Sequence, residues 1–300
     1  MGRVFVAGSI NMDVVATADR HPKIGETVAG NAVHYFPGGA NQAVASAKLG
    51  APTTLIGRLG TDAFGQQLRT FLAAQAVDLT HVKDTAEART GTAVITVADA
   101  DNTIVVVPGA NALVTADDVT APVLARGDVA VSQFEIPQAT IRTFFQRARA
   151  AGATTILNPA PAILFGKDLL DLVDILILNE TELGFLTNME LRDSDDPARF
   201  VEAASALQGG DRIICITLGK RGVLALIDGQ ASVIAGRAVK AVDTGAGDCF
   251  VGALASQLAN GAAIHNALDY ANAAASICVQ RMGAAPSMPT AAEVATLLST

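Results

Sequence analysis

Two aspartates and several small residues stand together in the stretch AVDTGAGDCFVGAL, at positions 241–254. The strand-like segment AGRAVKAVD precedes its glycines, and the helical pattern CFVGALASQLANG follows them. Small residues at such a strand-to-helix turn let backbone N–H groups converge on an anion, and the helix dipole favours negative charge there. A carboxylate would repel a resting anion, so Asp248 is suited to take a proton from an alcohol that attacks a phosphoryl group. An aspartate that merely caps the helix is the competing interpretation.

The elements that position this turn follow an alternation of strand-like and helical segments. Continuously apolar runs predict six strands: RVFVAGSI, TTLIGRLG, DVAVSQFE, TTILNPA, DILILNE and RIICITLG. Between them lie helical patterns such as NQAVASAKLG, FGQQLRTFLAAQ and TIRTFFQRARAAG. This rhythm predicts an α/β fold with a mostly parallel sheet flanked by helices on both faces, and with ligands at the carboxyl ends of the strands.

Two stretches break the rhythm, residues 12–36 and residues 91–107. The second, GTAVITVADADNTIVVV, is typical of two strands joined by a polar turn. We expect the two stretches to pair as a small accessory sheet. No repeat, low-complexity segment or linker divides the chain, so a single domain over residues 1–300 is predicted.

Charge and composition exclude several classes of protein. The formal net charge is −8 and no basic block could follow a phosphate backbone, so neither nucleic acid nor an anionic membrane is an expected partner. No apolar run approaches the roughly 18 residues of a membrane span. The first residues, MGRVFVAGSI, are predicted to form a strand rather than a signal peptide, and we expect a cytoplasmic protein. The widely spaced Cys215, Cys249 and Cys278 favour buried, reduced thiols over a disulfide framework or a zinc site.

Eight motifs, each weak alone, occur in order along the chain: GSINMD (8–13), GETV (25–28), PGGANQAVA (37–45), NPAPA (158–162), NETE (179–182), TLGKRGV (217–223), DTGAGD (243–248) and GAAPS (283–287). Together they resemble the ribokinase-like (PfkB) family of carbohydrate kinases over nearly the whole chain. The resemblance implies a parallel sheet flanked by helices, with a small β-sheet lid over the sugar made from residues 12–36 and 91–107. It also implies a homodimer that forms through the lid.

The resemblance further implies a sugar site and a catalytic turn. The residues that would bind the sugar are Asn11, Asp13, Gly38, Gly39, Asn41, Glu135 and Asp248. Carboxylates and amides suit this task because they pair with hydroxyl groups. Asp248 would be the general base, while the N–H groups of Gly245, Ala246 and Gly247 would hold the developing charge. Taken alone, these motifs equally fit turns, helix caps and an exposed strand end.

ATP and its magnesium ion are the implied cofactors on the other side of the turn. Asn179, Thr217, Gly219 and Asn272 would bind the nucleotide, and Glu182 would hold Mg²⁺ through water. Asn179 and Glu182 also satisfy the pattern of a helix capping box, which is the alternative. Lys220 and Arg221 are expected to be solvated turn charges. Neither GxGxxG nor GxxxxGK[ST] occurs, so a dinucleotide fold or a Walker-type loop has little support.

A monovalent cation, K⁺, is implied beside the catalytic turn. Its ligands would come from Asp243, Cys278, Arg281, Gly283 and Ser287, through backbone carbonyls, a carboxylate and a hydroxyl. The ion would fix the backbone of the turn rather than touch the substrate. A loop that holds no ion is the alternative.

Two loops depart from the family pattern. A Lys-Gly pair is missing between Gly39 and Ala40, and one residue is missing between Thr244 and Gly245. Either the loops are rebuilt or the sequence omits residues there, and a displacement near 1 Å can cost a catalyst about a hundredfold.

The motifs GSINMD, GANQAVA and NPAPA favour ribose, phosphorylated on its 5-hydroxyl. The alternatives are a kinase of fructose, deoxyribose or nucleosides, and a weakened homologue that binds sugar or nucleotide as a regulator.

Overall fold

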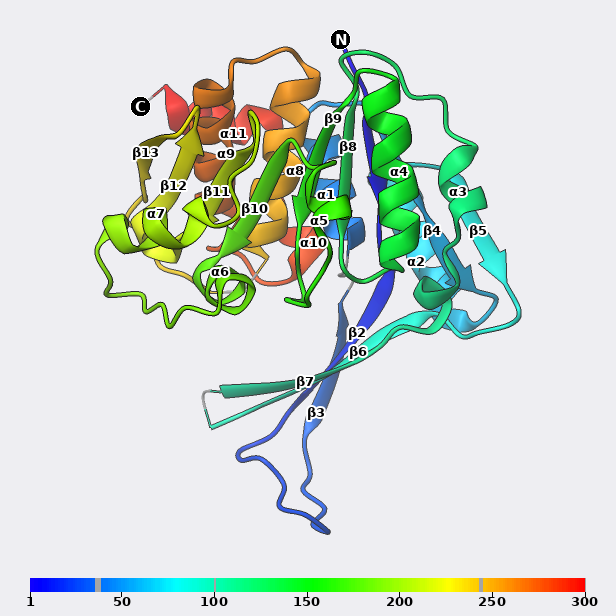
Figure 1. Ribbon diagram of the computed structural model, residues 1–300. Coiled ribbons are helices and arrows are strands. Elements are labelled where there is room, and N and C mark those ends of the chain that lie inside the picture. Colours follow the sequence, from blue (N-terminus) through cyan, green and yellow to red (C-terminus); the bar gives the residue numbers. More distant parts are fainter. Residues whose placement is uncertain (36–38, 100, 243–244, 300) are drawn as a thin grey trace.

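A nine-stranded sheet forms the centre of the computed structural model, which describes residues 1–35, 39–99, 101–242 and 245–299 (Figure 1). Its strand order is β13-β12-β11-β10-β9-β8-β1-β4-β5. All pairings from β11 to β5 are parallel. Strand β12 pairs antiparallel with both of its neighbours, β11 and β13. The strands are β1 (Val4–Ala7), β4 (Thr53–Gly60), β5 (Asp78–Thr85), β8 (Val129–Gln133), β9 (Thr154–Asn158), β10 (Ile175–Asn179), β11 (Ile213–Thr217), β12 (Gly222–Ile227) and β13 (Gln230–Ala235).

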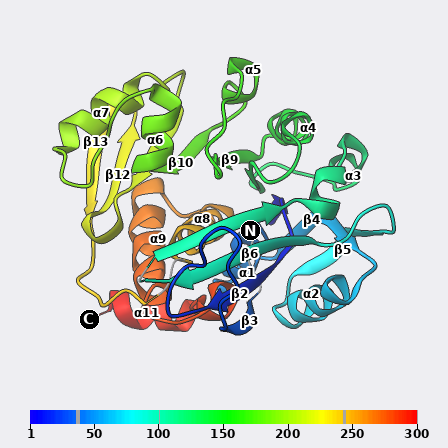
Figure 2. The ribbon, with the colours of Figure 1, turned by 90° about the horizontal axis from the view of Figure 1, so that it is seen from below.

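Helices cover both faces of this sheet because its strands are apolar on both sides. In β1, Val4 and Val6 join one buried cluster, and Phe5 and Ala7 join another. Figure 2 shows α8 and α9 on one side of the sheet and α4 and α7 on the other. The helices are α1 (Gly39–Lys48), α2 (Ala63–Ala74), α3 (Ala116–Thr120), α4 (Gln138–Ala150), α5 (Lys167–Leu170), α6 (Glu180–Thr187), α7 (Pro197–Ser205), α8 (Ala246–Ala259), α9 (Ile264–Cys278), α10 (Ala284–Ser287) and α11 (Ala291–Leu298). The predicted fold class is confirmed.

A second, smaller sheet projects from the edge of the main body where the parallel strands end (Figure 1). It consists of β2 (Asn11–Thr17), β3 (Asn31–Tyr35), β6 (Gly91–Ala98) and β7 (Asp101–Val107), in the order β3-β2-β6-β7. Strand β2 runs parallel to β6 and antiparallel to β3, and β7 is antiparallel to β6. The small sheet expected from the broken rhythm is therefore present.

One predicted strand is absent. The segment before the catalytic turn was expected to be extended, but β13 ends at Ala235 and residues 236–242 have no regular structure. Gly236 packs against the backbone of Lys220, and the N–H of Val242 donates to the carbonyl of Val279 over 2.7 Å. The segment is held by loops instead of by a neighbouring strand, which is why its β-branched residues do not form a ladder.

Among the described residues, no helix combines the length and the apolar character needed to cross a membrane. All three cysteines are buried and none forms a disulfide, as the sequence predicts.

Candidate active site

The predicted site residues meet because neighbouring parallel strands end at the same edge of the sheet. Glu135 follows β8, Asn179 ends β10 and Thr217 ends β11. Asn11 begins β2, just after β1, and the helices α1 and α8 begin at the same edge. Gly38 and Asp243 lie outside the described residues.

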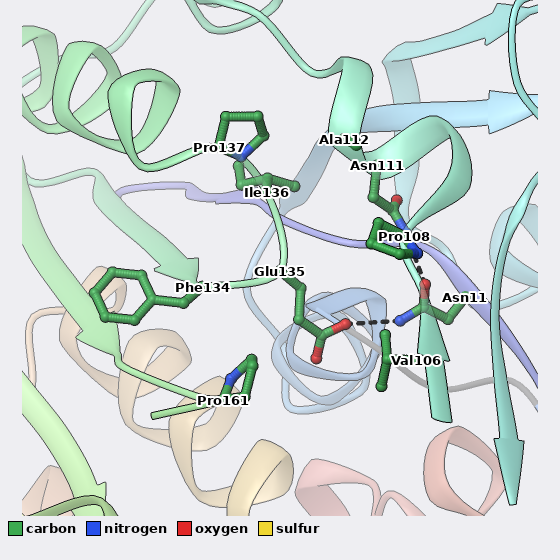
Figure 3. A pocket seen from close by; sticks show the side chains of 10 residues that line it. All are labelled: Asn11, Val106, Pro108, Asn111, Ala112, Phe134, Glu135, Ile136, Pro137 and Pro161. Atoms are coloured by element: carbon green, nitrogen blue, oxygen red, sulfur yellow. Dashed lines mark hydrogen bonds between the residues drawn. The ribbon is translucent and has the colours of Figure 1, made fainter. Parts of the chain in front are cut away.

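A pocket of about 370 Å³ opens between the main sheet and the small sheet (Figure 3). On its polar side, Nδ2 of Asn11 donates to Oε2 of Glu135 over 2.7 Å. Nδ2 of Asn111 donates to Oδ1 of Asn11 over 2.6 Å. Phe134 and Ile136 contribute to the apolar walls. A few fixed polar groups in a mostly apolar pocket are typical of a small-molecule site.

Two buried oxygen atoms beside this pocket have no hydrogen-bond partner among the described residues. They are Oδ1 of Asp13 and Oδ1 of Asn41. Burial, together with the negative charges of Glu135 and Asp248, raises the pKa of Asp13 to about 7. Buried polar atoms are normally paired, so unpaired acceptors in a cleft indicate a ligand that donates hydrogen bonds, such as a polyol.

Asp248 is held by two side chains of α1. Nδ2 of Asn41 donates to its Oδ2 over 3.0 Å, and Nε2 of Gln42 donates to its Oδ1 over 2.9 Å. Burial raises the pKa of Asp248, the hydrogen bonds from Gln42 and Asn41 lower it, and the charge of Glu135 raises it, so that it comes to about 6. The carboxylate is thus mostly ionised at neutral pH yet close to its pKa, which is the condition for an effective general base.

The N-terminus of α8 presents backbone N–H groups that no side chain of the described residues caps. Gly245 is the residue before the helix, and no described side chain caps it. The N–H groups of Ala246, Gly247 and Asp248 therefore lack partners within the helix, and open space lies where a Cβ of Gly247 would stand. Gly245 is packed tightly, because a Cβ there would lie 3.3 Å from Cα of Ala284.

A second pocket, of about 200 Å³, reaches the same helix end from the other side. Its lining includes Gly219, Ala246 and Asn272, so two predicted nucleotide residues meet the catalytic turn. The amide of Asn272 donates to the carbonyl of Ala235 over 2.8 Å, which ties α9 to β13. Thr217 does not line the pocket; its hydroxyl donates to the carbonyl of Leu178 over 3.4 Å.

Asn179 and Glu182 form the capping box that the sequence offered as an alternative. Oδ1 of Asn179 accepts from the N–H of Glu182, and Oε2 of Glu182 accepts from the N–H of Asn179, both over 2.9 Å. Burial raises the pKa of Glu182, and the charge of Asp248 raises it further. Oε1 of Glu182 accepts no hydrogen bond from the described residues, so a carboxylate oxygen is available to a hydrated magnesium ion.

The prediction that Arg221 is solvated is wrong. Its Nη1 donates to the carbonyl of Asp195 over 2.8 Å, its Nε lies 3.3 Å from the carboxylate of Asp193, and its guanidinium covers the ring of Phe200. A turn arginine beside an acidic loop finds anionic and aromatic partners that a sequence pattern does not reveal. Lys220 is exposed, as expected, and lines the second pocket.

The loop after α9 packs against the catalytic turn. The hydroxyl of Ser287 donates to the carbonyl of Ala284 over 2.6 Å and lies 3.0 Å from Sγ of Cys278. Arg281 forms an ion pair with Glu293 at 2.5 Å, so its side chain is engaged elsewhere and only its carbonyl suits a cation. Gly283 has a φ of +87°, which turns the chain into α10. Carbonyl and hydroxyl oxygens on one loop are the donors that an alkali cation prefers, so these residues fit such an ion.

Four amides belong to this site although the sequence analysis did not select them: the buried Asn111, Gln42 and Gln133, and the half-buried Asn158. Gln42 bonds Asp248, and Asn111 bonds Asn11. A polar amide within an apolar run, such as Gln133 in DVAVSQFE, was the available signal.

A carboxylate between a polar pocket and a second pocket at a helix N-terminus is the arrangement of an enzyme that phosphorylates an alcohol. The chain belongs to the pfkB family of carbohydrate kinases, whose family model matches residues 1–291. It is 38% identical over 300 residues to the ribokinase of Staphylococcus aureus strain COL, covering 97% of this chain and 98% of that one. It is 38% identical over 309 residues to the ribokinase of Bacillus subtilis strain 168, covering all of both. The structure of Arabidopsis thaliana ribokinase complexed with ribose and ATP matches with a TM-score of 0.90, at 33% identity and full coverage of both chains.

Proposed function

We propose that this protein transfers the γ-phosphoryl group of ATP to the 5-hydroxyl of D-ribose. The observation that carries the proposal is the position of Asp248: its carboxylate bonds Asn41 and interacts with Asp13 and Glu135 of the sugar side, while Ala246, two residues earlier, lines the second pocket. The similarity to ribokinases, including one whose structure holds ribose and ATP, supports this choice of substrates. ATP as the donor makes the cytoplasm the expected compartment.

In the proposed reaction, the sugar hydroxyls bind Asp13, Asn41 and the Asn11–Glu135 pair, which fixes the 5-hydroxyl near Asp248. Asp248 accepts the proton of that hydroxyl as its oxygen attacks the γ-phosphorus and the bond to the leaving ADP oxygen breaks. The backbone N–H groups at the start of α8 stabilise the negative charge on the transferring group. Asn179, Thr217, Gly219 and Asn272 remain the proposed nucleotide residues.

Two ions complete the proposal. Glu182 would hold Mg²⁺ through water, and the ion would supply positive charge to the phosphates. K⁺ would be held by carbonyl oxygens of Cys278, Arg281 and Gly283, together with Ser287 and Asp243. The contact of Gly245 with Ala284 supports a link from that loop to the catalytic turn.

A coupled ADP-release assay that compares ribose, 2-deoxyribose, fructose and adenosine at equal concentrations tests the proposal. We expect ribose to have the highest kcat/KM, because a site that bonds a hydroxyl leaves buried groups unpaired when that hydroxyl is absent, and rejection can reach about 10⁴-fold. Asp13→Ala should lose sugar turnover.

If fructose or adenosine exceeds ribose, the sugar assignment is wrong and the kinase assignment stands. If no sugar is turned over with Mg²⁺ and K⁺ present, the shortened loops have removed catalysis. That result would favour the alternative of a homologue that binds sugar or nucleotide as a regulator.

We also propose a homodimer that forms through the small sheet. The strand register puts Val14, Val94 and Val105 side by side on one face, and Asp13, Ala93 and Val106 on the other. Val106 lines the sugar pocket, so the row of three valines faces away from it. Val94 is 44% and Val105 63% exposed, and such an apolar row supports a partner of the same kind.

A further inference from the structure

A chain of three side-chain amides, the buried Gln42 and Gln133 and the half-buried Asn158, leads to Asp248. Nε2 of Gln133, at the end of β8, donates to Oε1 of Gln42 over 2.6 Å. Nε2 of Gln42 donates to Oδ1 of Asp248 over 2.9 Å and to Oδ1 of Asn158 over 3.2 Å. Nδ2 of Asn158 in turn donates to the carbonyl of Ile177 over 3.0 Å. The amides thus link β8, β9 and β10 to the carboxylate.

Two groups that can only accept hydrogen bonds determine which way each of these amides points. A carboxylate and a backbone carbonyl only accept, so the nitrogen of Gln42 must face Asp248 and the nitrogen of Asn158 must face Ile177. The oxygen of Asn158 then also faces the nitrogen of Gln42. The oxygen of Gln42 is left to face Gln133, which must donate. Reversing Gln42 would put its oxygen against the carboxylate.

Two members of this amide chain, Gln42 and Gln133, are enclosed by the protein. Gln42 is fully buried and Gln133 is 3% exposed. A Cβ at either Gly8 or Gly39 would lie 2.2 Å from Oε1 of Gln133, so the backbone at the end of β1 and at the start of α1 encloses that amide.

Several titratable groups face Asp248 from the surrounding elements. They are Asp13 of β2, Glu135 after β8, Glu182 of α6 and Cys249 of α8 itself. Each is anionic when it ionises, so each disfavours the ionised form of Asp248. The amides of Gln42 and Asn41 oppose them, and Gln42 has the larger effect of the two.

We propose that Gln42 is a positioning residue for phosphoryl transfer, which fixes the Asp248 carboxylate and stabilises its ionised form, and that Gln133 acts through Gln42 by fixing the direction of its amide. The inference rests on the proposed role of Asp248 as the general base. Asn41 faces the sugar, whereas Gln42 and Gln133 need not touch any substrate.

The pH dependence of kcat with saturating ribose and ATP tests the role of Gln42. Gln42→Leu removes the donor, and losing a hydrogen bond to the charged form raises the pKa of a carboxylate. We expect the acid limb of the profile to move upward by about one to two pH units, with the KM for ATP unchanged. Gln208→Leu is the matched control, because Gln208 donates one hydrogen bond to the carbonyl of Arg212, a residue outside the site, and its profile should not move.

The role of Gln133 is tested by a double-mutant cycle. Gln133→Leu should shift the acid limb in the same direction but less than Gln42→Leu. If Gln133 acts only through Gln42, the double variant has the profile of Gln42→Leu alone. Additive shifts would show that Gln133 acts on the site independently and would overturn that part of the inference.

A carboxyl ¹³C NMR titration of Asp248 separates this inference from the proposed function, because it needs no turnover. An unchanged Asp248 titration in Gln42→Leu overturns the inference even if Asp248→Asn is inactive. Full activity of Asp248→Asn instead overturns the proposed function, whatever the titration gives. Should Gln42→Leu fail to fold, the same titration is made with Gln42→Met and Gln133→Leu. Gln42→Met keeps the length of the side chain and lacks the donor.

Discussion

Two carboxylates of one cleft, Asp13 and Asp248, differ in their hydrogen bonds and in their pKa values. Asp13 has an unpaired oxygen and a pKa of about 7, whereas Asp248 is bonded by two amides and has a pKa of about 6. Sugar hydroxyls would donate to Asp13 and favour its ionised form. Substrate binding would therefore offset the free energy that it costs the empty site to bury this carboxylate without a hydrogen-bond donor. Function and stability therefore oppose each other at Asp13.

Asp13→Asn should stabilise the unliganded protein at alkaline pH. The folded state raises the pKa of Asp13 from 3.8 to about 7, so it favours the protonated carboxyl. The contribution of this group to stability is present below about pH 4 and is lost as pH rises to about 7. An uncharged asparagine avoids that loss, and we expect Tm to rise by about 2–4 °C at pH 8.

Calorimetric scans between pH 4 and pH 8 check this expectation. The gain should shrink toward pH 4, and ribose binding by Asp13→Asn should be lost. A variant less stable than the parent at pH 8 would contradict the assigned environment of Asp13.

The sequence indicated most of the charged and small residues of the candidate site but not their supporting shell. Asp248, Glu135 and Asn41 stand in motifs whose spacing limits their roles. Gln133 contacts Gln42 across 91 positions of the chain, and that pairing depends on the close approach of β8 and α1. Arg221 was misjudged for the same reason, since its partners belong to a distant loop.

At the scale of elements, the catalytic turn depends on what packs behind it. Helix α8 begins where Gly245 meets Ala284 of α10, and the backbone of Val242 is bonded to Val279 at the end of α9. The loop between α9 and α10 thus restrains both sides of the turn. A cation in that loop would order the N–H groups of α8 without touching the sugar.

Activity in a buffer free of sodium and potassium should rise and saturate as KCl is added. Ionic strength is kept constant with a bulky organic cation, since screening also changes the binding of charged substrates. Ser287→Ala should need more KCl for half-maximal activity, because it removes a hydroxyl ligand. A flat response across the titration would exclude the proposed cation site.

The elements of the main sheet were predictable because their strands are continuously apolar and their helices amphipathic. The pairing of β2 with β6 was only an expectation, since it joins segments about 80 residues apart and no local pattern encodes such a register. The segment 236–242 was predicted to be a strand from its β-branched residues, yet it lacks a partner strand. Local propensity fails where tertiary packing decides.

At the scale of the whole molecule, the small sheet has two faces with different tasks. Its row of Asp13, Ala93 and Val106 faces the pocket, and its row of Val14, Val94 and Val105 faces outward. Large exposed apolar side chains that lie side by side on a sheet mark an interaction surface. The proposed partner subunit covers the outward face.

Replacing both Val94 and Val105 by lysine should separate the proposed dimer, because the two residues are directly opposite in the ladder and their like charges would lie at the interface. Light scattering after size exclusion should give about 30.6 kDa for this variant and twice that mass for the parent. Val123→Lys, at a side chain 75% exposed on the main body, should remain dimeric. A monomeric parent would contradict the proposal.

The most direct measurement compares the parent protein with Asp248→Asn by ³¹P NMR of the reaction with ribose, ATP, Mg²⁺ and K⁺, with ligand affinities measured by calorimetry. The account predicts ribose 5-phosphate from the parent, and a kcat lower by about 10²–10⁴ for the variant with ribose and ATP affinities near those of the parent. A loss of less than fivefold would remove Asp248 from the role of general base. A parent protein that binds both ligands but forms no sugar phosphate would contradict the kinase assignment itself.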